Sequence, residues 1–295
     1  MSNKNVYGKF CNFKGVLFFM EIQKIHALCF SPTGTTRRVV SHVAESVAAL
    51  YANVPLEIRD FTLPGCRERG TEIGNSELVI MGLPVYAGRL PNLLLKYLVT
   101  WKSEGALAVP VVVYGNRSYG NALIELRDIL ENGGFHTIAA AAFVGQHSFS
   151  GKLATGRPDE EDLERARQFA AGIVEKTEAW GEKEFSPVKV PGCGMPDYGG
   201  YYKPKGIGGE MVNFLKVKPV TSDCCIHCRR CAKVCPMGAI DPENPFNIPG
   251  ICIKCNACLK ICPTGSKQLL DEAYLSHVRH LETTFIRRSK VELFY

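Results

Sequence analysis

Between residues 20 and 185, short apolar runs alternate with segments whose apolar positions recur at helical spacing. Strands are expected at 24–30, 54–60, 77–82, 109–115 and 136–145. Helices are expected at 35–51, 90–101, 119–132 and 158–182. Three of the strands are almost continuously apolar, which is typical of a parallel sheet that helices cover on both faces. The pattern therefore predicts a doubly wound α/β domain with five strands over residues 20–185.

The pattern changes on either side of this domain. Residues 1–19 precede the first strand and are expected to be a disordered extension. Residues 186–217 are rich in Gly and Pro and predict a connector, part of which packs across the domain seam. Residues 218–268 are too few for a conventional core and need another source of stability. Residues 269–295 show roughly helical spacing and predict a helical tail.

Composition and charge exclude several classes of protein. The 46% hydrophobic and 22% charged content is ordinary for a globular protein and excludes general disorder. No apolar run approaches the ~18 residues of a membrane-spanning helix. The net charge of +6 includes no basic run with interleaved aromatic residues, so a nucleic-acid partner is not expected. The sequence carries no signal for an oligomeric state.

The 13 cysteines are distributed unevenly. Eight lie between Cys225 and Cys262, and a dense cluster of this kind indicates metal binding in a reducing compartment, for which we expect the cytoplasm. A secreted disulfide scaffold would instead be short and cross-linked throughout. The remaining five cysteines are Cys11, Cys29, Cys66, Cys193 and Cys224.

The eight clustered cysteines form two copies of one motif, C-x2-C-x2-C-x3-C-P. This is the spacing of bacterial ferredoxins with two [4Fe–4S] clusters. Three cysteines at x2 spacing can wrap one cubane, and the fourth points away along the chain toward the neighbouring cluster. The first cluster is therefore assigned to Cys225, Cys228, Cys231 and Cys262. The second is assigned to Cys252, Cys255, Cys258 and Cys235.

Other interpretations of this segment explain less of it. A zinc ribbon needs four cysteines and does not explain two runs of four that each end in Pro. Cys224 is a rival first ligand, but it breaks the x2 spacing, and His227 occupies a spacer position. The seven basic and three acidic residues of 218–268 roughly offset the charge of two clusters at about −2 each, or they are simply solvated.

The first predicted strand runs into Ser31-Pro-Thr33-Gly34-Thr35-Thr36 and then into a helix. Free N–H groups at a helix N-terminus favour an anion, and small hydroxyl side chains add donors. The loop lacks the lysine of a nucleoside triphosphate site, so it suits a single terminal phosphate. The alternative is an ordinary capped helix start, since Ser and Thr are common cap residues.

Two further loops contain Gly and an aromatic residue at the carboxyl ends of strands, where ligands bind in open α/β sheets. They are 82–91, with Tyr86, and 114–121, with Tyr119. With these loops the chain resembles the flavodoxin family over about 160 residues. The resemblance implies FMN binding by Ser31, Thr33, Gly34, Thr35, Thr36, Pro84, Val85, Tyr86, Ala87, Gly88, Asn116, Arg117, Tyr119 and Gly120.

Within this implied site, the resemblance gives the residues different roles. The Ser/Thr loop would hold the phosphate, Tyr86 and Tyr119 would flank the isoalloxazine, and backbone near 87–88 and Asn116 would face its polar edge. The two tyrosines could instead be surface or interdomain aromatics. Many flavodoxins stack a Trp on the flavin, whereas here both Trp are placed on predicted helices. His147, after the fifth strand, faces either the flavin or the second domain, or is a structural histidine.

The whole order resembles the ferredoxin–flavodoxin fusion family of anaerobes over about residues 20–270. The implied fold is a five-stranded flavodoxin-like domain with a small α+β dicluster ferredoxin domain. The implied function is electron transfer between two [4Fe–4S] clusters and FMN, serving soluble redox partners. We regard a carrier as favoured over an enzyme, and no catalytic residue is assigned.

Two alternatives of different classes stay open. One is an FMN- and iron–sulfur-dependent oxidoreductase that reduces a small quinone, enone or nitro compound at the flavin. The other is a ferredoxin whose flavodoxin-like half is a docking domain without FMN. Flavin content and turnover without a protein partner distinguish these interpretations.

Overall fold

A mostly parallel sheet forms the centre of the larger half of the protein. The computed structural model describes residues 21–51, 53–68, 70–180 and 185–295. The five long strands lie in the order β2-β1-β4-β6-β8, which is the 2-1-3-4-5 order of flavodoxin-like sheets. These strands are β1 (Lys24–Cys29), β2 (Leu56–Asp60), β4 (Glu77–Pro84), β6 (Leu107–Tyr114) and β8 (Ala140–Val144).

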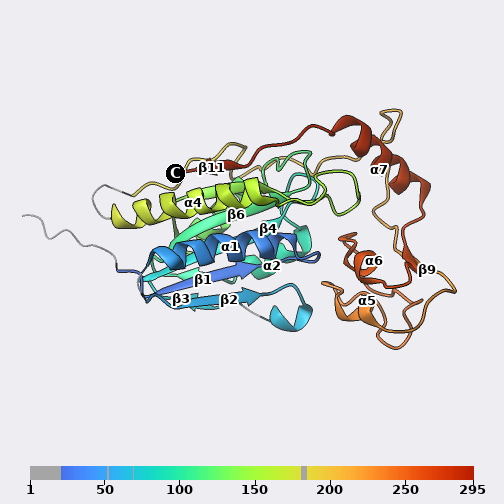
Figure 1. Ribbon diagram of the computed structural model, residues 1–295, viewed down its shortest axis with the longest axis horizontal. Helices are drawn as coiled ribbons and strands as arrows, with labels where there is room; N and C mark the ends of the chain where they lie inside the picture. Colours follow the sequence, from blue (N-terminus) through green and yellow to red (C-terminus); the bar gives the residue numbers. More distant parts are fainter. Residues whose placement is uncertain (1–20, 52, 69, 181–184) are drawn as a thin grey trace, which may run out of the picture.

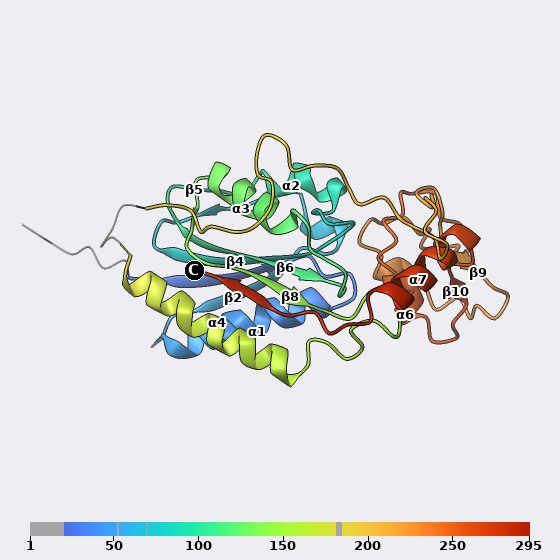
Figure 2. The ribbon, with the colours of Figure 1, turned by 90° about the horizontal axis from the view of Figure 1, so that it is seen from above.

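Helices cover both faces of this sheet (Figure 2). Helices α1 (Thr35–Leu50) and α4 (Glu160–Glu178) pack side by side on one face. Helices α2 (Leu95–Leu98), after the short η2 (Asn92–Leu94), and α3 (Ala122–Asn132) lie on the other face. Each face has its own apolar core, and β6 is buried along its whole length because it lies in the middle of the sheet.

The sequence predictions for this half are confirmed in type and order, with ends that differ by a few residues. The structure adds short pieces that the apolar pattern did not predict, because two or three residues give no periodicity. They are η1 (Pro64–Cys66), β3 (Glu72–Ile73) and β5 (Lys102–Ser103). The single strand expected at 136–145 is divided into β7 (His136–Thr137) and β8, both of which pair with β6. No helix of the described residues is long and apolar enough to span a membrane. The expected extension 1–19 lies outside the described residues.

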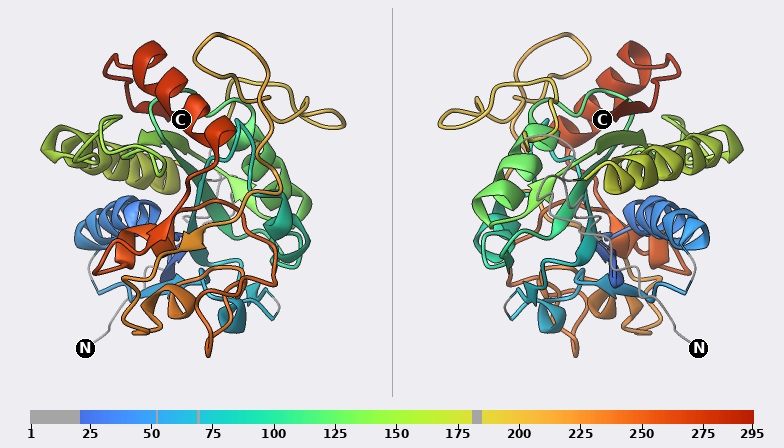
Figure 3. Two further views of the ribbon diagram at one scale, coloured as in Figure 1. Left: turned by 90° about the vertical axis from the view of Figure 1, so that its right-hand side faces the viewer. Right: turned by 90° about the vertical axis from the view of Figure 1, so that its left-hand side faces the viewer.

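The cysteine-rich module lies beyond the carboxyl ends of the central strands (Figure 1). It contains only short elements and a small apolar cluster around Cys231, Ile240 and Cys258. These elements are β9 (Val220–Thr221), α5 (Arg230–Lys233), α6 (Ala257–Ile261) and β10 (Lys267–Gln268). Figure 3 shows that the module covers the end of the sheet where parallel strands present their loops.

The tail differs from the prediction of a helix over 269–295. Helix α7 (Glu272–Thr284) is present, but the chain then returns to the larger half and forms β11 (Glu292–Phe294). Strand β11 pairs antiparallel with β8, so the sheet gains an edge strand beyond the five that were predicted. The free edge of β8 offers unpaired backbone groups, and a strand from the far end of the sequence satisfies them.

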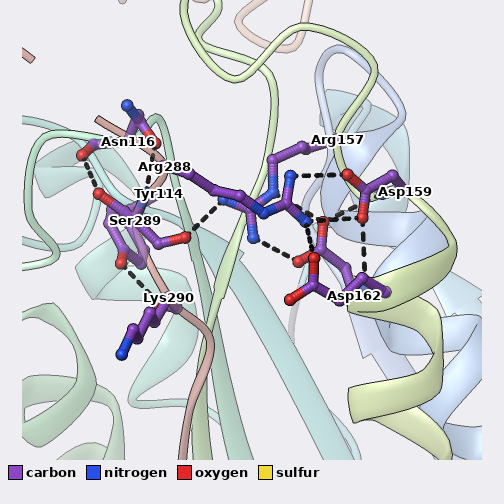
Figure 4. A network of polar contacts seen from close by, with 9 residues as sticks. Tyr114, Asn116, Arg157, Asp159, Asp162, Arg288, Ser289 and Lys290 are labelled. Atoms are coloured by element: carbon purple, nitrogen blue, oxygen red, sulfur yellow. Dashed lines mark hydrogen bonds and ion pairs between the residues drawn. The ribbon is translucent and has the colours of Figure 1, made fainter. Parts of the chain in front are cut away.

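Polar contacts hold this returning segment in place (Figure 4). The buried Asn116 amide donates to the carbonyls of Phe285 and Arg287, and its oxygen accepts from the Ser289 N–H. Arg157 donates to the Ser289 carbonyl at 2.6 Å and forms a buried ion pair with Asp162. The tail therefore ties the cysteine-rich module to the flavodoxin-like sheet.

Candidate functional site

Four cysteines line a cavity near the surface of the module, which we call the outer thiol cavity: Cys225, Cys228, Cys231 and Cys262. Cys228 is exposed, and the neighbouring Ile226 is 63% exposed. Although burial opposes it, hydrogen bonds from the Lys267 backbone N–H and the Thr264 hydroxyl lower the pKa of the Cys262 thiol. This cavity therefore presents thiols close to solvent.

The other four cysteines line a second cavity, which we call the inner thiol cavity: Cys235, Cys252, Cys255 and Cys258. It is the more buried of the two, and burial raises the pKa of the Cys255 and Cys258 thiols to about 12. Backbone N–H groups point at two of its sulfurs, from Ala239 to Cys235 Sγ at 3.3 Å and from Lys254 to Cys252 Sγ at 3.4 Å. Ligation here requires deprotonation, which a bound metal drives.

The fourth cysteine of each run lies with the three cysteines of the other run. Cys262 joins the first run in the outer cavity, and Cys235 joins the second run in the inner cavity. These are the two sets of four that the spacing predicts. Within the described ranges, no group of three or more His, Cys, Asp or Glu side chains is arranged around a single metal-ion position.

The backbone explains how each run curls around its cavity. In both runs the second and fourth residues after the first cysteine have positive φ: His227 (53°) and Arg229 (58°), then Lys254 (56°) and Asn256 (61°). Left-handed residues at these points turn the chain toward the cavity at a steric cost that non-glycine residues rarely carry. Cys224 is exposed and lines neither cavity, and the His227 ring packs 5.6 Å from Phe246.

The loop after β1 has the features of an anion site. Gly34 is the N-cap of α1 at φ 83°, a conformation that favours glycine, and this residue has no side chain with which to cap the helix. The Ser31 hydroxyl accepts from the Arg37 N–H at 2.9 Å, and the Ser31 N–H donates to Thr62 at 2.6 Å. The first turn contains Arg37 and no acidic residue, and the Asp60 carboxylate at the end of β2 lies 3.7 Å from the Arg37 guanidinium. A terminal phosphate fits this loop.

The two other expected flavin loops contact each other directly. Asn121 N–H donates to the Gly88 carbonyl at 2.9 Å. Gly120 has φ 52°, and a Cβ there would lie 2.5 Å from the Gly88 oxygen, so only glycine allows this approach. Tyr86 closes a tight turn with Arg89 at the tip of its loop. The loops thus form one surface at the carboxyl edge of β4 and β6.

Two side chains predicted to serve the flavin are bound by the tail. Tyr119 donates to Glu292 at 2.7 Å and packs against Tyr114, with 5.5 Å between ring centroids. The Asn116 side chain binds the segment 285–289, as described above. The structure therefore brings Tyr86, Gly88 and Gly120 together at the loop surface, and it directs Tyr119 and the Asn116 side chain toward the C-terminal segment.

The connector contributes residues that sequence reasoning missed. Tyr202 donates its N–H to the Ala87 carbonyl at 2.8 Å, and the Arg117 guanidinium lies 3.9 Å from its ring centroid. Arg89 lies over the rings of Tyr198 and Tyr201, at 5.0 and 5.3 Å. The repeated tyrosines of 198–202 were a signal, since aromatic residues in a Gly- and Pro-rich connector need a surface to pack on.

The inner thiol cavity adjoins the flavin-loop surface. Ile253 packs against the same apolar core as Val85, and Asn256 donates to the Ser148 carbonyl at 3.1 Å. Burial raises the pKa of the Tyr86 phenol well above its usual value, and the nearby Cys255 and Cys252 raise it further. No residue of the flavin loops lines either cavity. The contacts just described place the inner cysteines next to the loop of Tyr86.

His147 lies at this seam as a neutral side chain. Burial lowers its pKa to about 4, and His277, Arg117 and Lys260 lower it further, whereas Glu282 opposes them. Its Nδ1 accepts from the Phe149 N–H at 3.1 Å, so Nε2 carries the proton. His147 is thus a buried, hydrogen-bonded histidine that lies near His277 and Lys260 of the C-terminal part of the chain.

The low pKa of His147 predicts that the free energy of unfolding decreases in acid. The pKa of His147 is lower in the folded protein than the value of about 6.5 in the unfolded chain. Its neutral form therefore contributes fully to the free energy of unfolding above pH ~6.5, and this contribution is lost as the pH falls toward 4. We expect His147→Gln to lose about 3 kcal/mol less of its free energy of unfolding than the native protein between pH 6.5 and 4, because the variant has no imidazole to protonate. Urea unfolding at a series of pH values measures the difference, and parallel curves would contradict it.

Comparisons with known proteins found one family model and several solved structures that this chain resembles. Residues 224–266 match a family model described as a 4Fe-4S dicluster domain. A search of the curated proteins gave no match. Among solved structures, the chain is similar to a flavodoxin from the domain Archaea, at 15% identity and TM-score 0.39, covering 52% of this chain and 98% of that one.

Two further solved structures extend over the same half. A Streptococcus pneumonia TIGR4 flavodoxin has 18% identity and TM-score 0.37, with 52% of this chain and 98% of that one covered. A rubredoxin oxygen:oxidoreductase from Desulfovibrio gigas has 16% identity and TM-score 0.37, with 54% and 37% covered. The fold assignment rests on the strand order observed here. The chain joins a flavodoxin-like half to a dicluster ferredoxin segment, the arrangement of a flavodoxin–ferredoxin fusion.

Proposed function

We propose that the protein is an electron carrier in which two [4Fe–4S] clusters exchange electrons with FMN in the flavodoxin-like half. Cys225, Cys228, Cys231 and Cys262 would hold one cluster, and Cys252, Cys255, Cys258 and Cys235 the other. Ser31 and residues 33–36 would hold the FMN phosphate. The clusters supply one-electron chemistry, and the chain's own contribution is to fix the distances between the redox groups.

The observation that carries this proposal is the position of the inner thiol cavity. Its cysteines lie against the loop of Tyr86, at the edge of the sheet where open α/β folds bind their ligands. If the module were only joined covalently to the flavodoxin-like half, its buried thiols would not be expected to lie against these loops. The contact supports direct electron exchange between the two halves.

The same geometry suggests an order of transfer. The outer cavity, with exposed Cys228 and Ile226, is the side that a soluble redox partner can reach. The inner cavity contains the more buried cysteines and lies against the loop of Tyr86. We infer that electrons pass between partner and FMN through the outer cluster and then the inner one. The partners we expect are soluble redox proteins of anaerobic metabolism in the cytoplasm.

The test is anaerobic reconstitution followed by rapid mixing with a limiting reductant. We expect about eight irons and one FMN per chain, with cluster bleaching that precedes flavin bleaching at a rate independent of protein concentration. A concentration-dependent second phase would show transfer between molecules and would contradict the proposal. So would iron clusters that reduce without any change in the flavin.

A second candidate has one observation in its favour. The side chains of Asn116 and Tyr119 are bound by the C-terminal segment, as would suit a docking domain that holds no flavin. In that case the protein is a ferredoxin with a fused partner-binding half. Titration of the iron-loaded protein with FMN distinguishes the two, because only the first candidate quenches flavin fluorescence with saturation at one equivalent.

A further inference from the structure

Arg117 occupies an unusual position in the loop after β6. An ideal Cβ built at Gly88 would lie 3.7 Å from Arg117 Nη2, so the guanidinium lies across the turn of the other flavin loop. On its other side it lies over the Tyr202 ring, 3.9 Å from the centroid. Arg117 is therefore held between the flavin-loop surface and the connector.

This guanidinium lacks an acidic partner in the part of the chain that the structure describes. Other arginines of low exposure are paired with acids: Arg89 with Glu125 at 2.6 Å, Arg127 with Asp128 at 2.6 Å, and Arg157 with Asp162. Arg67 is half-buried without an ion pair as well, but its guanidinium donates to backbone carbonyls. Burial lowers the pKa of Arg117, and of its neighbours only Tyr202 opposes this. A half-buried charge without a counter-ion is costly, and an anion beside it recovers that free energy.

The surroundings increase the positive potential. Besides Arg117, the charged groups facing the nearby His147 are Lys260 from α6 and Glu282 from α7. The Glu282 carboxylate is already bound by the Ser150 hydroxyl at 2.7 Å and by Lys152 at 3.1 Å. The seam between the flavin loops and the module thus carries an excess of positive charge where electrons would arrive.

We propose that Arg117 is a redox-tuning residue that stabilises the negative charge which a flavin ring gains on reduction. The inference rests on the proposed function. Reduction of a flavin by two electrons with uptake of one proton leaves one negative charge on the ring; here the clusters would supply the electrons and solvent the proton. Because oxidised flavin is neutral at its ring, a fixed cation favours the reduced form and raises the midpoint potential.

The experiment compares the FMN midpoint potential of the native protein with that of Arg117→Gln. We expect the ratio of reduced to oxidised FMN affinity to fall about tenfold, which is a decrease of about 30 mV for a two-electron couple. Arg117→Lys keeps the charge and should retain most of the native potential. Arg59→Gln is the matched control, because Arg59 also lies over an aromatic ring, that of Trp101 at 5.6 Å, but outside the flavin loops.

The outcomes separate the two levels of inference. Native protein that binds FMN, with the same potential in Arg117→Gln as in the Arg59→Gln control, overturns the tuning role and leaves the carrier function intact. Native protein that binds no FMN overturns both. If Arg117→Gln cannot retain FMN, Arg117→Lys, which keeps the charge, decides the question. A native FMN midpoint potential in Arg117→Lys supports the tuning role, and a potential lowered by about 30 mV overturns it.

Discussion

Replacing Cys235 together with Cys252 by alanine should remove only one cluster, whereas replacing Cys235 together with Cys225 should remove both. The reason is that Cys235 lines the inner cavity with Cys252, although it belongs to the same run as Cys225. Iron analysis after anaerobic reconstitution should give about four irons per chain for the first pair and close to none for the second.

The opposite assignment makes the opposite prediction, so the iron counts decide it directly. If each run held its own cluster, the pair Cys225 and Cys235 would lose only one cluster, and the pair Cys235 and Cys252 would lose both. The second run supplies the mirror-image control, since Cys262 with Cys225 should leave about four irons. Cys224→Ala should leave the iron content unchanged, because Cys224 lines neither cavity.

The two sets of four cysteines could be grouped from the sequence because ligand spacing is a local property. Three cysteines at x2 spacing can face one centre only if the backbone turns sharply between them. The positive φ values of His227 and Lys254 produce these turns. The parallel strands are predictable for a similar reason, since buried strands such as β6 leave an almost unbroken apolar run.

The rest of the site depends on contacts between residues far apart in the sequence. Nothing local to Glu292 shows that it receives a hydrogen bond from Tyr119, or that its neighbours join β8 as an edge strand. A three-residue strand carries no periodicity, and its register is fixed by the partner strand. The same holds for Tyr202, whose role follows from its contacts with Ala87 and Arg117.

The second large effect is expected at Asp162. Its carboxylate and the Arg157 guanidinium are almost wholly buried, with 2% and 4% of their side chains exposed, and Arg157 also donates to the Ser289 carbonyl. Asp162→Ala leaves a buried guanidinium without a counter-ion, which costs about 3–5 kcal/mol. The melting midpoint should fall by roughly 10 °C, as followed by far-UV circular dichroism.

Glu161→Gln is the matched control, because Glu161 also holds the tail, through Arg288 at 2.8 Å, but its side chain is 76% exposed. An exposed pair of this kind contributes less than about 1 kcal/mol, so the control should melt within a few degrees of the native protein. Equal stability of the two variants would contradict a stabilising role for the buried Arg157–Asp162 ion pair.

Because Arg157 also donates to the Ser289 carbonyl, Asp162→Ala should loosen the tail that ties the module to the sheet. Intramolecular reduction of the flavin should then be slower in Asp162→Ala and unchanged in the control. This result would show that the Arg157–Asp162 ion pair helps to fix the distance between the redox groups.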